Sequence, residues 1–129
     1  MTTDLWSVVA ISLWGLLFTY LPVLARIQKA GLAWGFGNRD GPLPEAAAWV
    51  LRGERAYVNH LANLTPFVAV ALVAHVAGKH DEVTATASVV FVVARVLHSL
   101  LYVGGVRYLR TLAFWTSLGA LGVIISRLV

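Results

Sequence analysis

Four apolar segments of the sequence are each long enough to cross a lipid bilayer as a helix, which takes about 20 apolar residues. Two of them carry no charged residue, the third is interrupted by a single arginine, and the fourth has an uncharged centre. The segments are Leu5–Ala25, Ala56–Gly78, Val83–Gly104 and Arg107–Val129. The pattern therefore predicts an all-α membrane protein, a bundle of four transmembrane helices built by residues 1–129 as one domain.

The connections between these segments are polar and rich in helix-breaking residues. Residues 26–44 contain four glycines and two prolines, so we expect a loop there. Pro44 and Glu45 resemble the first turn of the next helix, which would run from about residue 45 to 78. A helix of that length is about 50 Å long, more than the bilayer core needs. Its first turns should therefore project out of the membrane.

Composition agrees with the membrane assignment. Hydrophobic residues make up 59% of the chain and charged residues 12%, about half the share of a soluble domain. The net charge of +4 then reports topology, and no nucleic-acid partner is expected. The chain has no cysteine, so neither a disulfide nor a protein thiol is available for chemistry.

Basic residues are unevenly distributed between the two ends of the predicted bundle. Four spans place both termini on one side of the membrane. Seven basic residues lie in or beside the first and third connections, against two on the opposite side: Arg26, Lys29, Arg39, Arg52, Arg55, Arg107 and Arg110, against Lys79 and Arg127. Because positive charge favours the cytoplasm, we expect both termini outside it. The expected location is a bacterial inner membrane.

Polar residues gather near the start of the second span. Arg55, Asn59, Ala62 and Pro66 follow helical spacing and share one face. Pro66 cannot donate a hydrogen bond to the carbonyl of Ala62, which leaves an acceptor on that face. Polar groups inside a membrane are costly unless they face protein, water or a ligand. This face is the first candidate for a functional surface.

Arg95 is the second candidate, because it lies near the middle of the third span. It shares a helix face with His98, Ser99 and Tyr102. No acidic residue is expected inside a span, so Arg95 has no obvious counter-ion. It can be a structural arginine bonded to carbonyls, or it can bind an anion. Paired carboxylates and metal-binding motifs are absent from the spans, so no metal site is expected.

These motifs resemble the MAPEG family, the membrane-associated proteins in eicosanoid and glutathione metabolism. The resemblance rests on Glu54-Arg55-Ala56-Tyr57-Val58-Asn59 followed by Pro66-Phe67, and on Ala94-Arg95-Val96-Leu97-His98 with Tyr102 one turn later. The run Gly37-Asn38-Arg39-Asp40 is similar to the first loop of bacterial members.

The resemblance implies a homotrimer that binds glutathione between subunits and conjugates or reduces lipophilic electrophiles beside membrane lipid. It implies that Arg55, Asn59, Arg95, His98 and Tyr102 contact or support glutathione. Arg110 corresponds to the arginine that stabilises the thiolate, and Arg107 is the alternative. A cation near the sulfur lowers the pKa of a thiol. With no cysteine in the chain, that thiol must come from the cofactor.

One position departs from the family pattern. The glutamate expected on the second span falls at Ala62 here. Asn63, His60 or the Ala62 carbonyl could take its place, or the usual glutathione binding is lost. Two hypotheses follow, a membrane glutathione transferase or peroxidase, and a non-catalytic protein of the same fold that binds a lipid or an anionic ligand. A proton-coupled exporter is disfavoured, because the first span lacks an acid.

Overall fold

The computed structural model describes all residues 1–129, and its only regular secondary structure is helical. Four are long and apolar enough to cross a membrane, and the fifth is a short segment beside the first. The helices are α1 (Thr3–Ala30), α2 (Leu32–Phe36), α3 (Ala48–Val76), α4 (Glu82–Gly104) and α5 (Arg107–Ser126). The predicted four-helix transmembrane fold is therefore confirmed.

The predicted boundaries of the first connection are wrong. Helix α1 continues past Arg26 to Ala30, and α2 occupies part of the expected loop. Gly31, with φ of 88°, ends α1 in a conformation that suits glycine. Helix α2 then folds back on α1, and a side chain at Gly35 would lie 2.9 Å from Ile27. A larger residue at position 35 would therefore require the Ile27 side chain to move.

The start of α3 also differs from the prediction. The helix begins at Ala48, three residues after Glu45. The carbonyl of Pro44 accepts a hydrogen bond from Arg26, and Glu45 pairs with Lys29 at 3.5 Å. Both residues are thus tied to α1 before the helix starts. At about 1.5 Å per residue, α3 still spans roughly 44 Å and extends beyond the bilayer core.

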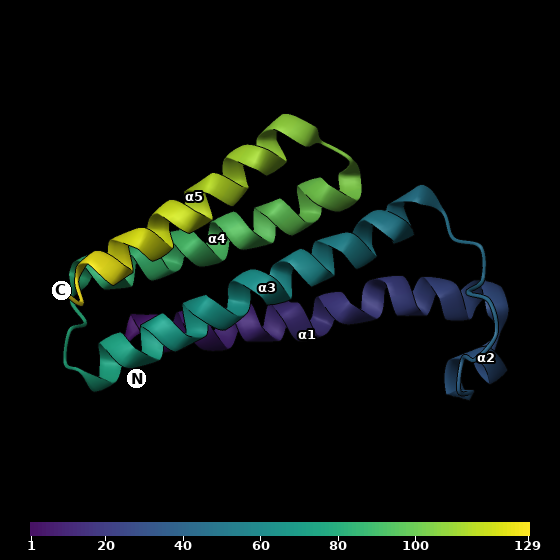
Figure 1. Ribbon diagram of the computed structural model, residues 1–129, viewed down its shortest axis with the longest axis horizontal. Helices are drawn as coiled ribbons and strands as arrows, with labels where there is room; N and C mark the ends of the chain where they lie inside the picture. The colour runs from purple at the N-terminus through teal and green to yellow at the C-terminus, as the bar shows by residue number, and fades with distance from the viewer.

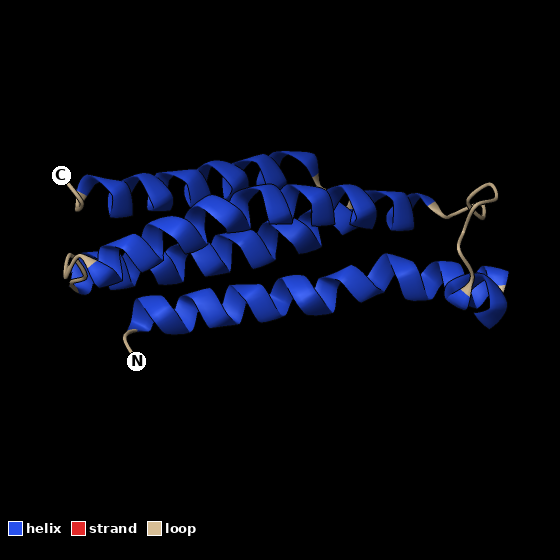
Figure 2. Ribbon diagram, turned by 60° about the horizontal axis from the view of Figure 1, so that its bottom comes forward, coloured by secondary structure: helices blue, strands red, loops and turns tan.

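The long helices run side by side, with both chain termini at the same end of the bundle (Figure 1). Helix α1 packs on α3, and α4 packs most extensively on α5. Figure 2 shows that the connecting loops lie at the two ends, as expected for a bundle that crosses a membrane. The loop with α2 marks the end far from the termini.

An apolar core joins the helices in the half of the bundle nearer the termini. Phe67 of α3 and Phe91 of α4 are fully buried, and their rings stack with centroids 4.0 Å apart. Ile11 of α1 and Ile124 of α5 complete the contact from the other two long helices. The large apolar side chains that face outward are those expected to meet lipid.

Polar contacts fasten the bundle at the end that holds the termini. Asp81 accepts hydrogen bonds from the backbone of Val83 and Thr84 and so caps α4. It also pairs with Arg127 beyond α5. Asp4 is buried and accepts a hydrogen bond from Ser88 at 2.9 Å. Asp4 lies in the first turn of α1, so it is near a helix end, and the sequence places every acid of the chain near a helix end or in a loop.

Candidate functional site

A groove opens between α3 and α4 toward the end of the bundle opposite the termini. Its volume is about 530 Å³. The groove is lined by Glu54, Arg55, Val58, Asn59 and Ala62 of α3 and by Tyr102 of α4. Arg55, Asn59 and Ala62 do share one helix face, as their spacing predicts. Tyr102 of α4 lies at the same height along the bundle, so it lines the same groove.

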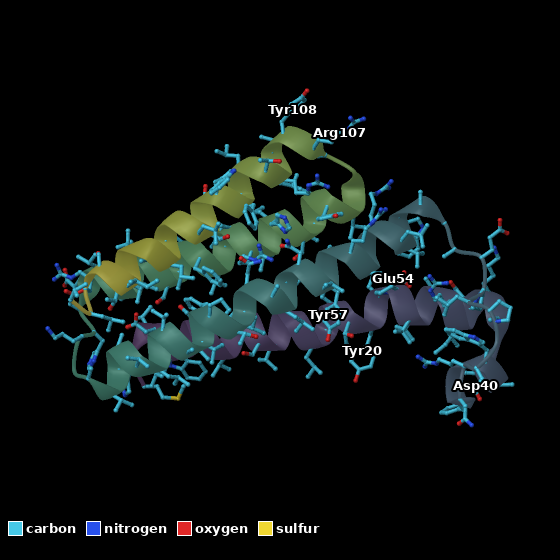
Figure 3. The ribbon with its side chains drawn as sticks, in the orientation of Figure 1. Tyr20, Asp40, Glu54, Tyr57, Arg107 and Tyr108 are labelled. Atoms are coloured by element: carbon cyan, nitrogen blue, oxygen red, sulfur yellow. The ribbon has the colours of Figure 1, made fainter.

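Glu54 lines the groove, but its carboxylate is already engaged. Arg26 of α1 donates hydrogen bonds to both of its oxygens, at 2.6 and 3.0 Å. A two-point contact of this kind between a guanidinium and a carboxylate is strong and directional. Arg26 is buried, and a further hydrogen bond to Pro44 fixes the loop that precedes α3. Figure 3 shows Glu54 on the side of α3 that faces the neighbouring helices.

Arg95 lies behind the groove wall and is fully buried. Its Nη2 donates to the side-chain oxygen of Asn59 at 2.9 Å and to the backbone carbonyl of Asn59 at 3.1 Å. Its Nε and Nη1 have no acceptor. The acceptor is thus Asn59, and the expected contribution of the Ala62 carbonyl is not found. Asn59 links the groove surface to the buried charge, and two donors of that charge are left unsatisfied.

Two aromatic contacts organise the other wall around Tyr102. The guanidinium of Arg110 lies over the tyrosine ring, 4.2 Å from its centroid, a favourable cation–π arrangement. His98 is buried and meets the same ring edge-on at 5.7 Å. Arg107, the alternative to Arg110, points away from the bundle at the tip of α5 (Figure 3).

The structure therefore brings together all six residues that the sequence singles out. Arg55, Asn59 and Tyr102 line the groove, Arg95 is bonded to Asn59, and His98 and Arg110 contact Tyr102. Their grouping defines one candidate site.

The two other polar residues considered on α3 lie elsewhere. His60 is fully buried, and a side chain at Gly15 of α1 would lie 2.8 Å from its Nε2. The imidazole thus faces α1, and it does not line the groove. Asn63 donates to the Asn59 carbonyl one turn earlier at 2.8 Å. Neither residue supplies a negative charge in place of the missing glutamate.

Sequence reasoning missed the roles of Arg26 and Glu54. They are 28 positions apart, so no local spacing pattern connects them. A usable signal existed, because α1 and α3 are antiparallel neighbours and both residues lie near the same membrane boundary. An arginine and a glutamate at matching heights on such helices favour a pair. Similarly, Arg52 donates to the Val103 carbonyl at 2.8 Å and ties α3 to the end of α4.

Comparison with protein families identifies the chain. The MAPEG family profile matches residues 5–129, which includes every residue of the groove. No curated protein matches the sequence.

Proposed function

Because the chain belongs to the MAPEG family and is an integral membrane protein, we propose that it is a glutathione-dependent transferase or peroxidase acting on lipophilic electrophiles. The observation that carries the proposal is the groove in which Arg55, Asn59 and Tyr102 converge. Arg95 and Arg110 stand directly behind two of these residues. The groove thus combines cationic groups with access from the surface of the bundle.

The residues of the groove suit a small anionic thiol. Arg55 presents a guanidinium at the surface, and guanidinium groups bind carboxylates in a two-point geometry. Arg95 retains two unsatisfied donors, and a buried donor without an acceptor costs about 1–3 kcal/mol. A carboxylate or an ordered water that reached them would remove that cost. Arg55, Asn59, Arg95, His98 and Tyr102 are therefore the residues proposed to hold glutathione.

Arg110 is the residue proposed to act on the sulfur. When bound, glutathione supplies the thiol whose sulfur makes the new bond to the electrophile. A nearby cation stabilises a thiolate and so increases the fraction of the reactive form at neutral pH. Arg110 does not line the groove itself, and it lies next to the groove through the ring of Tyr102, on which it stacks. His98 packs against that ring and maintains its position.

Two further features are proposed with this function. The groove lies at the end of the bundle where the basic residues concentrate, so we place that end in the cytoplasm and both termini outside, in a bacterial inner membrane. We also propose a homotrimer, in which a neighbouring subunit covers the groove. A groove on the surface of a single subunit is open, and a second subunit would exclude water from the thiol.

A second candidate function is supported by a separate observation. An apolar groove of about 520 Å³ lies between α4 and α5 and is lined almost entirely by aliphatic side chains, among them Val93, Leu97, Leu109 and Leu112. Such a surface suits a lipid chain. A non-catalytic protein that binds a lipid or an anionic ligand is therefore the alternative.

Turnover separates the two functions. Purified protein in liposomes is mixed with glutathione and a membrane-soluble aryl halide, and conjugate formation is followed against empty liposomes. The proposed enzyme raises the rate in proportion to the amount of protein. A rate equal to that of empty liposomes, with folded protein and bound lipid, supports the alternative.

A further inference from the structure

The groove is surrounded by positive charge. Arg55 lines it directly, Arg110 stacks on its Tyr102 wall, and Arg95 lies one hydrogen bond behind Asn59. Three guanidinium groups therefore act on anything bound there. Because Arg95 is fully buried, its charge is screened less than it would be in water.

No free carboxylate balances these charges. Glu54 is the only acid that lines the groove, and Arg26 occupies both of its oxygens. At the same end of the bundle Glu45 is paired with Lys29. Asp40 lies at the outer tip of the loop beside α2, well away from Glu54 (Figure 3).

The remaining acids lie at the opposite end, with the termini. Asp4 is bonded to Ser88, Asp81 is paired with Arg127, and Glu82 follows directly in the first turn of α4. These three acids therefore lie far from the groove along the bundle.

We propose that the groove selects a low-molecular-weight thiol whose amino group is acylated or absent, in preference to one with a free ammonium group. This inference rests on the proposed function, because it names the class of thiol for that site. An ammonium group that leaves water needs an anionic partner, and here it meets guanidinium groups instead. A thiol that carries only carboxylates gains from the same charges.

Binding to the wild-type protein tests the preference. Glutathione is compared by calorimetry with two analogues, one acetylated at the γ-glutamyl amino group and one in which that amino group is replaced by hydrogen. We expect both analogues to bind about tenfold more tightly, equivalent to about 1.4 kcal/mol. The second analogue adds no bulk, so a steric effect of the acetyl group cannot account for its behaviour.

Ala62→Glu is the matched variant. Ala62 is exposed on the groove wall, so a longer side chain can be accommodated. The new carboxylate should favour glutathione over both analogues and so reverse the order of affinity. Thermal unfolding of the variant checks that it is folded. If it is not folded, the comparison of the three thiols on the wild-type protein still tests the preference.

The outcomes separate this inference from the function on which it rests. Tighter binding of glutathione than of the desamino analogue by the wild-type protein overturns the inference and leaves the proposed function standing. Absence of binding by all three thiols overturns both.

Discussion

At the scale of single residues, the account depends on how Arg95 is accommodated inside the bundle. Its guanidinium is fully buried, and its only acceptors within the chain belong to Asn59. A buried charge is tolerated only when it is hydrogen-bonded or paired. Asn59 therefore has two roles, since it lines the groove and also stabilises the charge behind it.

Replacing Asn59 tests this contact. Asn59→Ala removes the side-chain acceptor at 2.9 Å and should lower the free energy of unfolding by about 1–3 kcal/mol. Thermal or denaturant unfolding in detergent measures the change. Asn63→Ala is the control, because Asn63 bonds only within its own helix, and it should cost less than about 1 kcal/mol. Equal losses in the two variants would contradict the role given to Asn59.

Arg110 is expected to affect the thiol, whereas Arg107 is not. Arg110→Gln removes the guanidinium over Tyr102 and should reduce the rate of conjugation by about 10²-fold, the usual cost of losing one electrostatic stabiliser. It should also raise the pKa of the bound thiol, which the ultraviolet absorbance of the thiolate reports. Arg107→Gln, at the tip of α5, should change neither quantity. A larger effect at Arg107 would reverse the assignment.

The sequence predicts which candidate residues share a helix face, but it could not predict the contacts between helices. Helical spacing places Arg55, Asn59 and Ala62 on one face of α3. It places Arg95 and Tyr102 on one face of α4. Spacing does not show which residues of two neighbouring helices lie at the same height along the bundle. The bond from Arg95 to Asn59 joins residues 36 positions apart and depends on that height.

At the scale of helices, close approach of α1 and α3 fixes the middle of the bundle. Gly15 of α1 lies against the buried ring of His60. Gly15→Ala would place a carbon 2.8 Å from Nε2 of His60, so the helices or the ring must move. We expect a loss of about 1–3 kcal/mol in unfolding free energy, as for other overpacked cores.

The control for Gly15 is a glycine with open space around it. A side chain at Gly119 of α5 would meet nothing within 4 Å. Gly119→Ala should therefore be neutral or stabilising by up to about 1 kcal/mol, because alanine favours helix. Both variants are compared by thermal unfolding in the same detergent. A Gly15→Ala protein as stable as wild type would show that the two helices are not in close contact.

Asp81 should make the stability of α4 depend on pH. Hydrogen bonds from the Thr84 backbone, and next the contact with Arg127, lower the pKa of the Asp81 carboxyl below its usual value. A lowered pKa means that the folded state favours the ionised form, so the carboxylate contributes stability above the ordinary aspartate pKa. That contribution is lost as the pH falls through the lower pKa of the folded protein.

Asp81→Asn isolates this effect, because asparagine caps a helix nearly as well but carries no charge. The wild-type protein should have the higher melting temperature at neutral pH, and the difference should shrink below about pH 4. Melting temperatures over that pH range provide the measurement. Parallel curves for the two proteins would exclude a contribution from the Asp81 charge.

The sequence predicts the long helices well and their ends less well. Apolar length and the scarcity of charge are sufficient to identify four spans. Glycines and prolines in residues 26–44 indicate a loop, yet α1 continues to Ala30 and α2 follows. Local composition could not show that α2 packs against Ile27, since that contact belongs to the tertiary structure.

At the scale of the whole molecule, the bundle separates two polar regions with an apolar core. The groove lies toward one end, and the Asp4–Ser88 and Asp81–Arg127 contacts lie at the other. Phe67, Phe91 and Ile11 are buried between them. This arrangement allows a charged site near one membrane surface while the rest of the bundle meets lipid.

Hydropathy does not distinguish an outer face that meets lipid from one that would meet a second subunit in the proposed trimer. Both surfaces are apolar, and α4 and α5 expose aliphatic side chains such as Val93 and Leu112 over a shared groove. In a membrane, neither the polarity nor the periodicity of the sequence separates a lipid-facing surface from a subunit-facing one. The proposed trimer therefore rests on the family resemblance and on the open groove.

Calorimetric titration of glutathione into the detergent-purified protein tests the central claim most directly. The account predicts saturable heat at millimolar or lower glutathione, reduced at least tenfold in affinity by Arg55→Ala, which removes the guanidinium exposed in the groove. Thermal unfolding should show that this variant is as stable as wild type. No saturable heat from folded wild-type protein at millimolar glutathione would contradict the account.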